Sequence, residues 1–498
     1  TAGDVNGDGY SDVIVGAFLH DTATLTETGK VYVYYGSPTG LSTLPDWSVT
    51  GDSAGARLGY SVSTAGDVDG DGYADIIVGA YQYSNGHKHE GAVFVYRGSP
   101  TGLHGSPAWS AESNTEDGRL GTSVGTAGDV DGNGCSDIIV GARWYDTDNE
   151  LGAAYVWEGS SGGLGADGTP YNADWTVQGD QIDAGFGRRV GTAGDVNGDG
   201  YADVIVGAAM YTDEETGEGR AYVYHGSASG LNNTANWFAE GDQSNAHFGG
   251  SVSTAGDVNG DGYADVIVGA YGYNQSGQDV GRALVYHGSA TGLSATDDWD
   301  VVGTQAFAQL GVSVSTAGDV NGDGYADVIV GEHQYTGGST FEGRAHVYYG
   351  SGTGLGTTSA WSEEANQTSA YYGISVNTAG DVNGDGYSDI IVGAPGYVGS
   401  LLGGGAAFVY HGAAGDVSDE QSWSALGTAG DSLGCAVNTA GDVDGDGYAD
   451  VLVGASGYDA GHPGEGAVFV YYGGPGGLVA ATADWTAEGD KLNAAFGS

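Results

Sequence analysis

One acidic, glycine-rich phrase occurs eight times along the chain. It opens the sequence as TAGDVNGDGYSDVIVGA and returns almost unchanged, with its threonine at Thr64, Thr126, Thr192, Thr254, Thr316, Thr378 and Thr439. A period this constant marks a repeat architecture in which each copy is one supersecondary unit. We therefore expect residues 1–498 to form a single domain, with units that begin near residues 1, 64, 126, 192, 254, 316, 378 and 439.

Each unit contains four runs that are typical of short β-strands. In the second unit these runs are residues 59–66, 74–80, 91–98 and 108–113, which are rich in β-branched or aromatic residues and bounded by Gly, Asp or Ser. Four short antiparallel strands, repeated radially, make the blade of a propeller. The expected fold class is all-β: an eight-bladed β-propeller of four-stranded antiparallel blades.

The two chain ends predict how the ring closes, because an open array would leave an unpaired strand at each end. The chain ends AAFGS, and the matching stretch of the fourth unit continues as AHFGGSVSTAG, so Ser498 stands about three residues short of the phrase at Thr1. We expect the N- and C-terminal segments to share one blade. Because the chain begins at Thr1 without Met or a signal peptide, we also expect a processed or trimmed product.

The repeated phrase holds a candidate calcium loop, counted here from its first Asp. Side-chain oxygens stand at positions one, three, five and nine, a glycine stands at position six, and position seven offers a backbone carbonyl. Hard cations such as Ca²⁺ are wrapped by six or more such oxygens. An Asx-Gly turn without an ion is the alternative, but three or four carboxylates in one tight loop repel each other unless a cation neutralises them. An EF-hand is excluded, because position twelve is valine in every copy and lies in a β-type run.

All eight units keep this pattern, so we expect eight calcium ions bound by the residues at positions one, three, five, seven and nine. In the first four units these residues are Asp4, Asn6, Asp8, Tyr10 and Asp12; Asp67, Asp69, Asp71, Tyr73 and Asp75; Asp129, Asp131, Asn133, Cys135 and Asp137; and Asp195, Asn197, Asp199, Tyr201 and Asp203. In the last four they are Asp257, Asn259, Asp261, Tyr263 and Asp265; Asp319, Asn321, Asp323, Tyr325 and Asp327; Asp381, Asn383, Asp385, Tyr387 and Asp389; and Asp442, Asp444, Asp446, Tyr448 and Asp450.

Charge narrows the classes of partner. Only 12 Lys and Arg stand against 65 Asp and Glu, giving a formal net charge of -53, which repels nucleic acid and anionic membrane surfaces. No apolar run approaches the roughly 18 residues that a membrane helix needs, so we expect no membrane insertion.

The sequence has no Ser-His-Asp order, no phosphate loop and no catalytic carboxylate pair outside the repeat, so we expect no enzyme, no catalytic residue and no organic cofactor.

The units resemble FG-GAP repeats, the calcium-binding β-propeller repeats of integrin α-subunits. The FG pair stands at Phe186, Phe248 and Phe496, with Leu or Tyr before the glycine in the other units, and the GAP triplet is complete at Gly393, Ala394 and Pro395. The resemblance covers the whole chain and implies the fold and the metal. It departs from integrins in having eight units, each with a calcium loop, where integrin propellers have seven blades and loops on only some.

Four further sets of residues need an interpretation. One tryptophan per unit, in phrases such as DWTVQGD, favours packing between blades over sugar stacking. A tyrosine follows the Gly-Ala pair in seven units and either packs or lines a binding face; these residues are Tyr83, Tyr145, Tyr211, Tyr273, Tyr335, Tyr397 and Tyr458, with His20 in the first unit. His87, His89 and Glu90 make a weak metal motif in a loop, and Cys135 and Cys435 are expected to be free thiols.

The function we expect is that of a calcium-stabilised adhesion or recognition module, secreted or at the cell surface and monomeric. Alternatives are a lectin-like glycan-binding propeller and a structural spacer of a larger surface protein. Because the connections from second to third strand vary most between units, we expect a protein or glycan ligand on the face opposite the calcium loops. The resemblance further implies that Phe186, Phe248, Tyr372 and Phe496 ring the axis and hold a basic group there.

Overall fold

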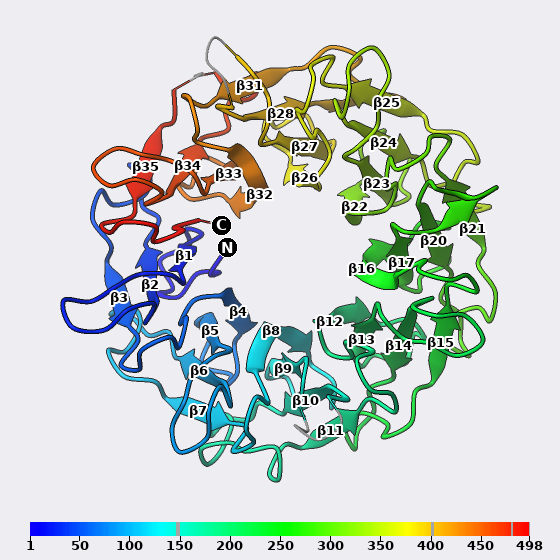
Figure 1. The fold of residues 1–498 in the computed structure, drawn as a ribbon. Coiled ribbons are helices and arrows are strands. Elements are labelled where there is room, and N and C mark those ends of the chain that lie inside the picture. Colours follow the sequence, from blue (N-terminus) through cyan, green and yellow to red (C-terminus); the bar gives the residue numbers. More distant parts are fainter. Residues whose placement is uncertain (146–149, 400–402, 480–481, 498) are drawn as a thin grey trace.

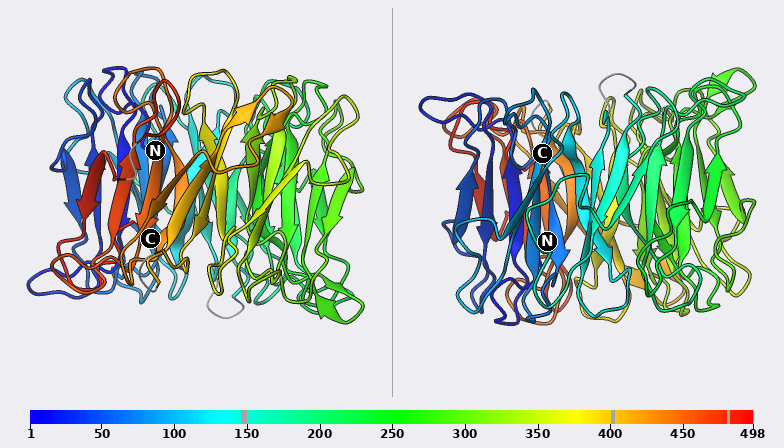
Figure 2. Two further views of the ribbon diagram at one scale, coloured as in Figure 1. Left: turned by 90° about the horizontal axis from the view of Figure 1, so that it is seen from above. Right: turned by 90° about the horizontal axis from the view of Figure 1, so that it is seen from below.

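The computed structural model describes residues 1–145, 150–399, 403–479 and 482–497. Seven four-stranded sheets and one three-stranded sheet stand around a central channel, as Figure 1 shows. The strands run between two faces that are made of loops (Figure 2). The described residues contain no helix, and so none that is long and apolar enough to cross a membrane. The predicted all-β, eight-bladed propeller is confirmed.

The blades follow the order of the units. The first holds β1 (Val13–Ala17), β2 (Lys30–Tyr34) and β3 (Trp47–Thr50). The second and third hold β4 (Ser61–Gly66), β5 (Asp75–Ala80), β6 (Ala92–Tyr96), β7 (Trp109–Glu112), β8 (Leu120–Gly128), β9 (Asp137–Ala142), β10 (Ala153–Trp157) and β11 (Trp175–Gln178). The fourth and fifth hold β12 (Arg189–Gly194), β13 (Asp203–Ala208), β14 (Arg220–Tyr224), β15 (Trp237–Glu240), β16 (Phe248–Gly256), β17 (Asp265–Ala270), β20 (Arg282–Tyr286) and β21 (Trp299–Val302).

The remaining blades repeat this plan. The sixth and seventh hold β22 (Val314–Gly318), β23 (Asp327–Glu332), β24 (Arg344–Tyr348), β25 (Trp361–Glu364), β26 (Ser375–Gly380), β27 (Asp389–Ala394), β28 (Ala406–Tyr410) and β31 (Trp423–Leu426). The eighth holds β32 (Leu433–Gly441), β33 (Asp450–Ala455), β34 (Ala467–Tyr471) and β35 (Trp485–Glu488). Two small hairpins decorate the loops: β18 (Asn274–Gln275) with β19 (Gln278–Asp279), and β29 (Gly412–Ala413) with β30 (Asp416–Val417).

Within each blade the strands pair antiparallel in chain order, with the first strand nearest the channel (Figure 1). The second strand is buried along its whole length in most blades, as in DVIVGA of β13. Such a strand is covered on both sides by neighbouring blades, which explains its continuous run of β-branched residues. The hydrophobic clusters accordingly join residues of two adjacent blades, for example Ile139 of β9 with Val206 of β13.

Both chain ends contribute to the first blade. Near the N-terminus, Gly3 pairs with Asp12; near the C-terminus, Phe496 pairs with Ala17 of β1, as Leu120 pairs with Ala142 in the third blade. The Gly497 N–H donates to the Gly16 carbonyl over 3.1 Å. Figure 1 shows both ends at the channel, beside the first and eighth blades, and Figure 2 shows them at different heights along its axis. The predicted shared blade is confirmed, although Ser498 lies outside the described residues.

The recurrent tryptophan fastens each blade to the next. Trp299 packs edge-on against Tyr348 of the following blade, with ring centroids 4.7 Å apart, and its indole N–H donates to the Gly356 carbonyl over 2.7 Å. The eight tryptophans are at most 8% exposed: Trp47, Trp109, Trp175, Trp237, Trp299, Trp361, Trp423 and Trp485. The packing interpretation is confirmed, and sugar stacking on these indoles is excluded because their faces are covered.

Candidate metal loops and the opposite face

The candidate metal loops connect the first and second strands of the four-stranded blades, and the loop of the first blade precedes β1, which is equivalent to a second strand. All eight loops therefore lie on one face of the ring. The fourth loop, between β12 and β13, is representative. Oδ1 of Asp195 accepts the Gly198 N–H over 2.6 Å, and Oδ2 accepts the Gly200 N–H over 2.8 Å. The first-position carboxylate therefore holds the backbone of positions four and six around itself. Glycine is needed at both positions, because their φ angles are 70° and 90°.

The carboxylates of each loop, and the Asn amide that six of the eight loops contain, gather over this wrapped backbone. The Asp199 N–H donates to Oδ1 of Asn197 over 2.9 Å, and the Asn197 amide donates to Asp199 Oδ2 over 3.0 Å. Where position three is Asp, three carboxylates bring one oxygen each within 4.8 Å of one another; these groups are Asp67, Asp69 and Asp71; Asp129, Asp131 and Asp137; and Asp442, Asp444 and Asp450. These donors are hard oxygens, which Ca²⁺ prefers.

Position nine has a second role that the sequence did not reveal. Asp203 is fully buried, and its carboxylate accepts the Val196 N–H over 2.8 Å and the Gly226 N–H over 2.9 Å. The aspartate thereby ties the loop to the end of the third strand. Burial raises the pKa of Asp203 to about 7, the two backbone hydrogen bonds oppose the rise, and Asp195 and Asp199 add to it. A bound cation would favour the charged form at this position.

The structure brings the predicted ligands of each unit into one loop, and the chemistry of this donor set fits a calcium ion. At position seven the residue also contributes its side chain to packing. Tyr201 covers Gly132 at position four of the preceding loop, and Cys135 takes the same place over Gly70. Cys135 and Cys435 are both free thiols, as expected.

Adjacent loops are joined directly around the ring. The Ala202 N–H of the fourth loop donates to the Asp129 carbonyl of the third over 2.9 Å, and the Ser11 N–H of the first loop donates to the Asp442 carbonyl of the eighth over 2.9 Å. Each candidate metal loop therefore contacts its neighbours and is not confined to its own hairpin.

The opposite face carries the connections from second to third strand and from each blade to the next. The two kinds of connection are hydrogen-bonded to each other. For example, the N–H of Arg119, between β7 and β8, donates to the carbonyl of His89, between β5 and β6, over 3.1 Å. A buried glutamate anchors the first kind of connection in four blades by accepting its backbone N–H groups; these are Glu90, Glu218, Glu342 and Glu465. Sequence reasoning missed this role, although the Glu-Gly pair before the third strand recurs in all four.

The tyrosines of this face are largely packing residues. Tyr83 packs edge-on against Phe94 at 6.0 Å, and Tyr397 against Phe408 at 5.3 Å. Where the third strand begins with arginine, its guanidinium lies over the tyrosine ring, as for Arg220 over Tyr211 at 3.7 Å. Of the two interpretations of these tyrosines, the contacts favour packing over a binding role.

The expected ring of aromatic residues at the FG positions is wrong. Phe186, Phe248, Tyr372 and Phe496 are at most 2% exposed. The ring of Phe186 packs edge-on against that of Tyr222 in β14, with ring centroids 5.2 Å apart, so this ring is part of the hydrophobic core. A buried ring offers no face to a basic group on the axis.

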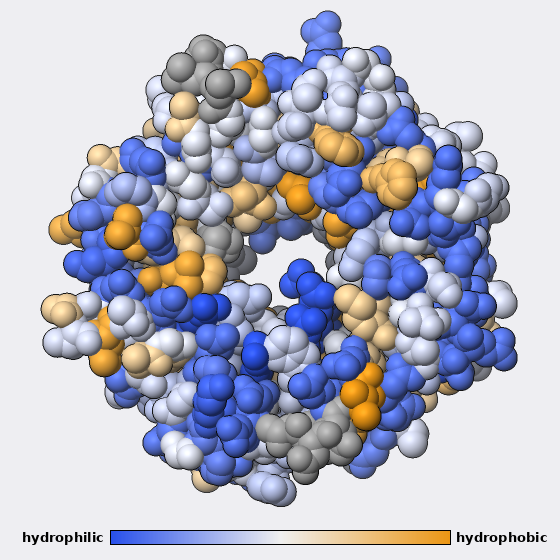
Figure 3. All heavy atoms as spheres, viewed as in Figure 1, coloured by the Kyte–Doolittle hydropathy of each residue, from blue (hydrophilic) through white to orange (hydrophobic). Residues whose placement is uncertain are grey.

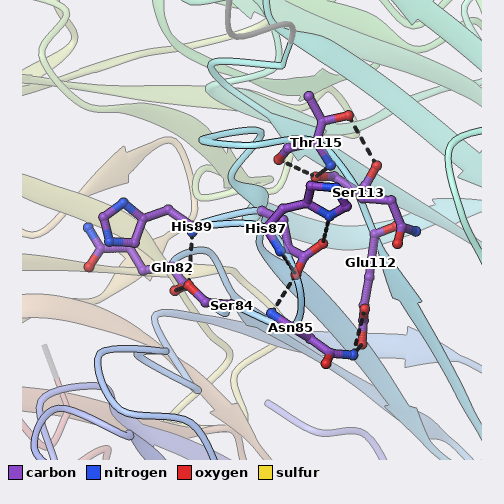
Figure 4. A network of polar contacts seen from close by, with 10 residues as sticks. Gln82, Ser84, Asn85, His87, His89, Glu112, Ser113 and Thr115 are labelled. Atoms are coloured by element: carbon purple, nitrogen blue, oxygen red, sulfur yellow. Dashed lines mark hydrogen bonds and ion pairs between the residues drawn. The ribbon is translucent and has the colours of Figure 1, made fainter.

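His87 and His89 do not converge on a metal site. Figure 4 shows the two imidazoles on different sides of their loop. Nδ1 of His87 lies 3.3 Å from Glu90, and Nδ1 of His89 lies 2.9 Å from Asp117, so each ring has its own carboxylate partner. These pairs brace the loop.

Comparison with known proteins agrees with the fold and the loops. The FG-GAP repeat family matches residues 1–34, 58–96, 120–157, 186–224, 248–286 and 437–471, and the FG-GAP-like repeat family matches residues 319–392. Together these matches cover more than half of the chain.

The curated relatives include integrin α-subunits. Integrin alpha-PS2 of Drosophila melanogaster is 32% identical over 251 residues, which are 47% of this chain and 16% of the integrin. Integrin alpha-V of Gallus gallus is 30% identical over 231 residues, 44% of this chain and 21% of the integrin. Integrin alpha-5 of Xenopus laevis is 37% identical over 156 residues, 30% of this chain and 14% of the integrin. The chain spans a small part of these relatives.

Among solved structures, a rhamnogalacturonan lyase aligns over 96% of this chain and 72% of its own, with 13% identity and a TM-score of 0.36. A similarity this weak carries no argument about activity. The family matches and the eight acidic loops identify the family. The chain belongs to the FG-GAP repeat family and is an integrin-α-like β-propeller.

Proposed function

We propose that the chain is a calcium-stabilised extracellular recognition module whose ligand meets the face opposite the calcium loops. The observation that carries the proposal is the set of eight loops in which carboxylate oxygens, joined by an amide oxygen in six of them, surround one glycine-rich turn. A ligand that binds only the folded loops stabilises the fold. The resemblance to integrin α-subunits favours adhesion as the purpose of this module and a cell-surface or secreted location.

The two faces differ in what they offer a partner. The loop face that holds the metal sites repeats almost the same sequence eight times, whereas the opposite connections differ in length and composition between blades. The opposite face also exposes large apolar side chains in these connections, including Ile182 at 55%, Phe307 at 59% and Phe341 at 37% exposure. Variable loops on a rigid scaffold are the usual place for recognition.

Calorimetry with and without calcium tests the metal. We expect a chelator to lower the melting temperature and added calcium to restore it, whereas magnesium should restore less, because Mg²⁺ demands a stricter octahedral geometry. A melting temperature that is unchanged by the chelator would contradict the proposed calcium dependence.

Variants with changed exposed side chains on each of the two faces test which face binds the ligand. Beads that carry the protein are incubated with native surface extracts, and the retained protein is compared between variants. Phe307→Ser and Phe341→Ser should reduce specific capture, whereas Leu44→Ser and Tyr171→Ser, which change exposed side chains of the calcium-loop face, should not. The reverse pattern would place the ligand on the calcium face.

A lectin-like function is the second candidate, favoured by crevices that recur between blades. A crevice of about 190 Å³ between the first two blades is lined by Tyr83 and Tyr96, and one of about 610 Å³ between the sixth and seventh by Tyr397 and Glu363. A glycan array, with free sugar as competitor, separates this candidate from protein recognition.

A further inference from the structure

Four arginines that have no carboxylate partner among the described residues gather at one side of the channel mouth, on the face opposite the candidate metal loops. Among the described residues, Arg57, Arg97, Arg220, Arg282 and Arg344 each form an ion pair with Asp or Glu. No described carboxylate lies within 4.0 Å of the other arginines, which are Arg119, Arg143, Arg188 and Arg189. In a chain with only 12 basic residues against 65 acidic ones, this separation calls for a cause.

Contacts between the second, third and fourth blades bring the four residues together. Leu120 pairs with Ala142, so Arg119 and Arg143 flank one strand pair. Gly187 packs on Gly141 across the next blade contact, which places Arg188 beside the same corner. Arg189 begins β12 at the channel and is exposed. Figure 3 looks onto this face and shows strongly hydrophilic residues along one side of the channel mouth.

Trp144 holds two of these guanidinium groups in place. Cζ of Arg119 lies 3.8 Å and Cζ of Arg143 lies 4.6 Å from its ring centroid. The Nε–H groups of both arginines are buried and have no hydrogen-bond partner among the described residues. Stacking on an aromatic ring orients a guanidinium but leaves its in-plane donors free for a ligand.

The neighbouring acidic groups are engaged with partners of their own. A crevice of about 380 Å³ beside Arg119 is also lined by Lys88, Asp117 and Glu150. Asp117 lies 2.9 Å from His89, and Glu150 shares a hydrogen bond with Asp183 that raises the pKa of Glu150. Burial and then the positive charges of Arg188 and Arg119 lower the pKa of Arg143. The cluster is thus positive, crowded and supplied with unused donors.

We propose that Arg119, Arg143, Arg188 and Arg189 form a binding site for a compact oxyanion, a carboxylate or sulfate group presented by the ligand of this face. The planar fork of arginine matches such groups with two parallel hydrogen bonds. The size of the ligand's charged part follows from the rest of the surface: a long polyanion would extend beyond the four arginines onto a protein of net charge -53. The inference refines the proposed recognition face, and it reverses the expectation of a basic group at the axis.

The test uses the full chain with bound calcium and methoxypyrene trisulfonate, a compact fluorescent anion, followed by anisotropy at low ionic strength. We expect saturable binding of one probe per chain. The double variant Arg143→Gln, Arg188→Gln should weaken it about tenfold or more, since a hydrogen bond to a charged group contributes roughly 1.5–3 kcal/mol. The matched double variant Arg97→Gln, Arg282→Gln removes the same charge elsewhere and should bind as the unchanged protein does.

Further arms identify the oxyanion and keep the test independent of folding. Sulfate and succinate are compared as competitors, and displacement by either one names the preferred group. The exposed Arg189→Gln alone should weaken binding without moving the melting temperature, so a misfolded double variant does not decide the outcome. Absence of saturable binding, equal losses in the cluster and control variants, or displacement only by long heparin chains would overturn the proposal. Because the probe needs no native partner, this result stands apart from the bead-capture test.

Discussion

Two glycines per blade determine how closely neighbouring blades approach. The glycine of the Gly-Ala pair at the end of each second strand packs against the backbone of the FG glycine in the next blade, as Gly141 does against Gly187. A Cβ atom on Gly141 would lie 1.9 Å from the Gly187 carbonyl oxygen, far closer than van der Waals contact allows. The two halves of the FG-GAP motif are therefore one contact, repeated around the ring.

Gly141→Ala should destabilise the protein, because backbone on both sides leaves the new methyl group no space. Overpacking of this kind costs about 1–3 kcal/mol. Gly125→Ala is the matched control in the same blade, since no atom lies within 4 Å of the position of its Cβ. Chemical denaturation of both variants measures the difference, and an equal stability of the two would refute the contact as the reason for glycine.

The buried aspartate at position nine predicts an unusual pH dependence for the calcium-free protein. The pKa of Asp203 is about 7 in the fold, above its ordinary value of 3.8, so the folded state binds more protons than the unfolded chain between these two pH values. Stability should then fall as pH rises from about 4 to about 7 and change little above. Calcium should reverse this trend, because it favours the ionised carboxylate. Melting temperatures with a chelator and with calcium at pH 5 and pH 8 check this, and parallel curves would contradict it.

At the scale of elements, the strands and the acidic loops between them were predictable, whereas the contacts between neighbouring loops were not. Alternating and β-branched runs fall at one place in every unit, so β4 to β7 lie within a few residues of the predicted ranges. The hydrogen bond from Ala202 to Asp129 joins residues of different units and follows only from the spacing of the blades. The arginine cluster was not predictable for the same reason, since residues 119, 143 and 188 become neighbours only when consecutive blades pack together.

Asp199→Ala should reduce the calcium content from eight ions to seven. Asp199 accepts hydrogen bonds from within its own loop, from Tyr201 and Asn197, whereas the bond to the third loop comes from Ala202. The fourth site should thus be lost, whereas the neighbouring loops should keep their backbone hydrogen bonds and their calcium ions. Metal analysis after dialysis measures the count, with the exposed Glu214→Ala as a control for lost charge. Loss of several ions together would show that adjacent loops bind calcium cooperatively.

At the scale of the whole molecule, closure makes every blade contact equivalent except one. The contact at the FG position is similar in the fourth blade and in the first: Phe186 packs on Tyr222 and Phe496 packs on Tyr32, both with centroids 5.2 Å apart. Phe186 continues directly into β12, whereas Phe496 is far from β1 along the chain and is held there by pairing with Ala17. The termini themselves predicted this arrangement, because the missing part of the last phrase stands at the start of the chain.

Phe496→Ala should therefore open the ring more than Phe186→Ala does. Both changes remove a fully buried aromatic ring and should lower stability by about 3–5 kcal/mol. In the fourth blade the continuous chain keeps the strand in place after the loss. In the first blade the C-terminal segment is free to detach, exposing the edge of β1, and local opening of this kind costs less than global unfolding.

Hydrogen exchange should show lost protection over residues 13–17 for Phe496→Ala, with the corresponding residues 203–208 still protected in Phe186→Ala. Equal protection of the two second strands would mean that the ring is closed by the remaining contacts of the first and eighth blades, chiefly Trp485 packed against Tyr34 at 4.6 Å, without help from the terminal strand.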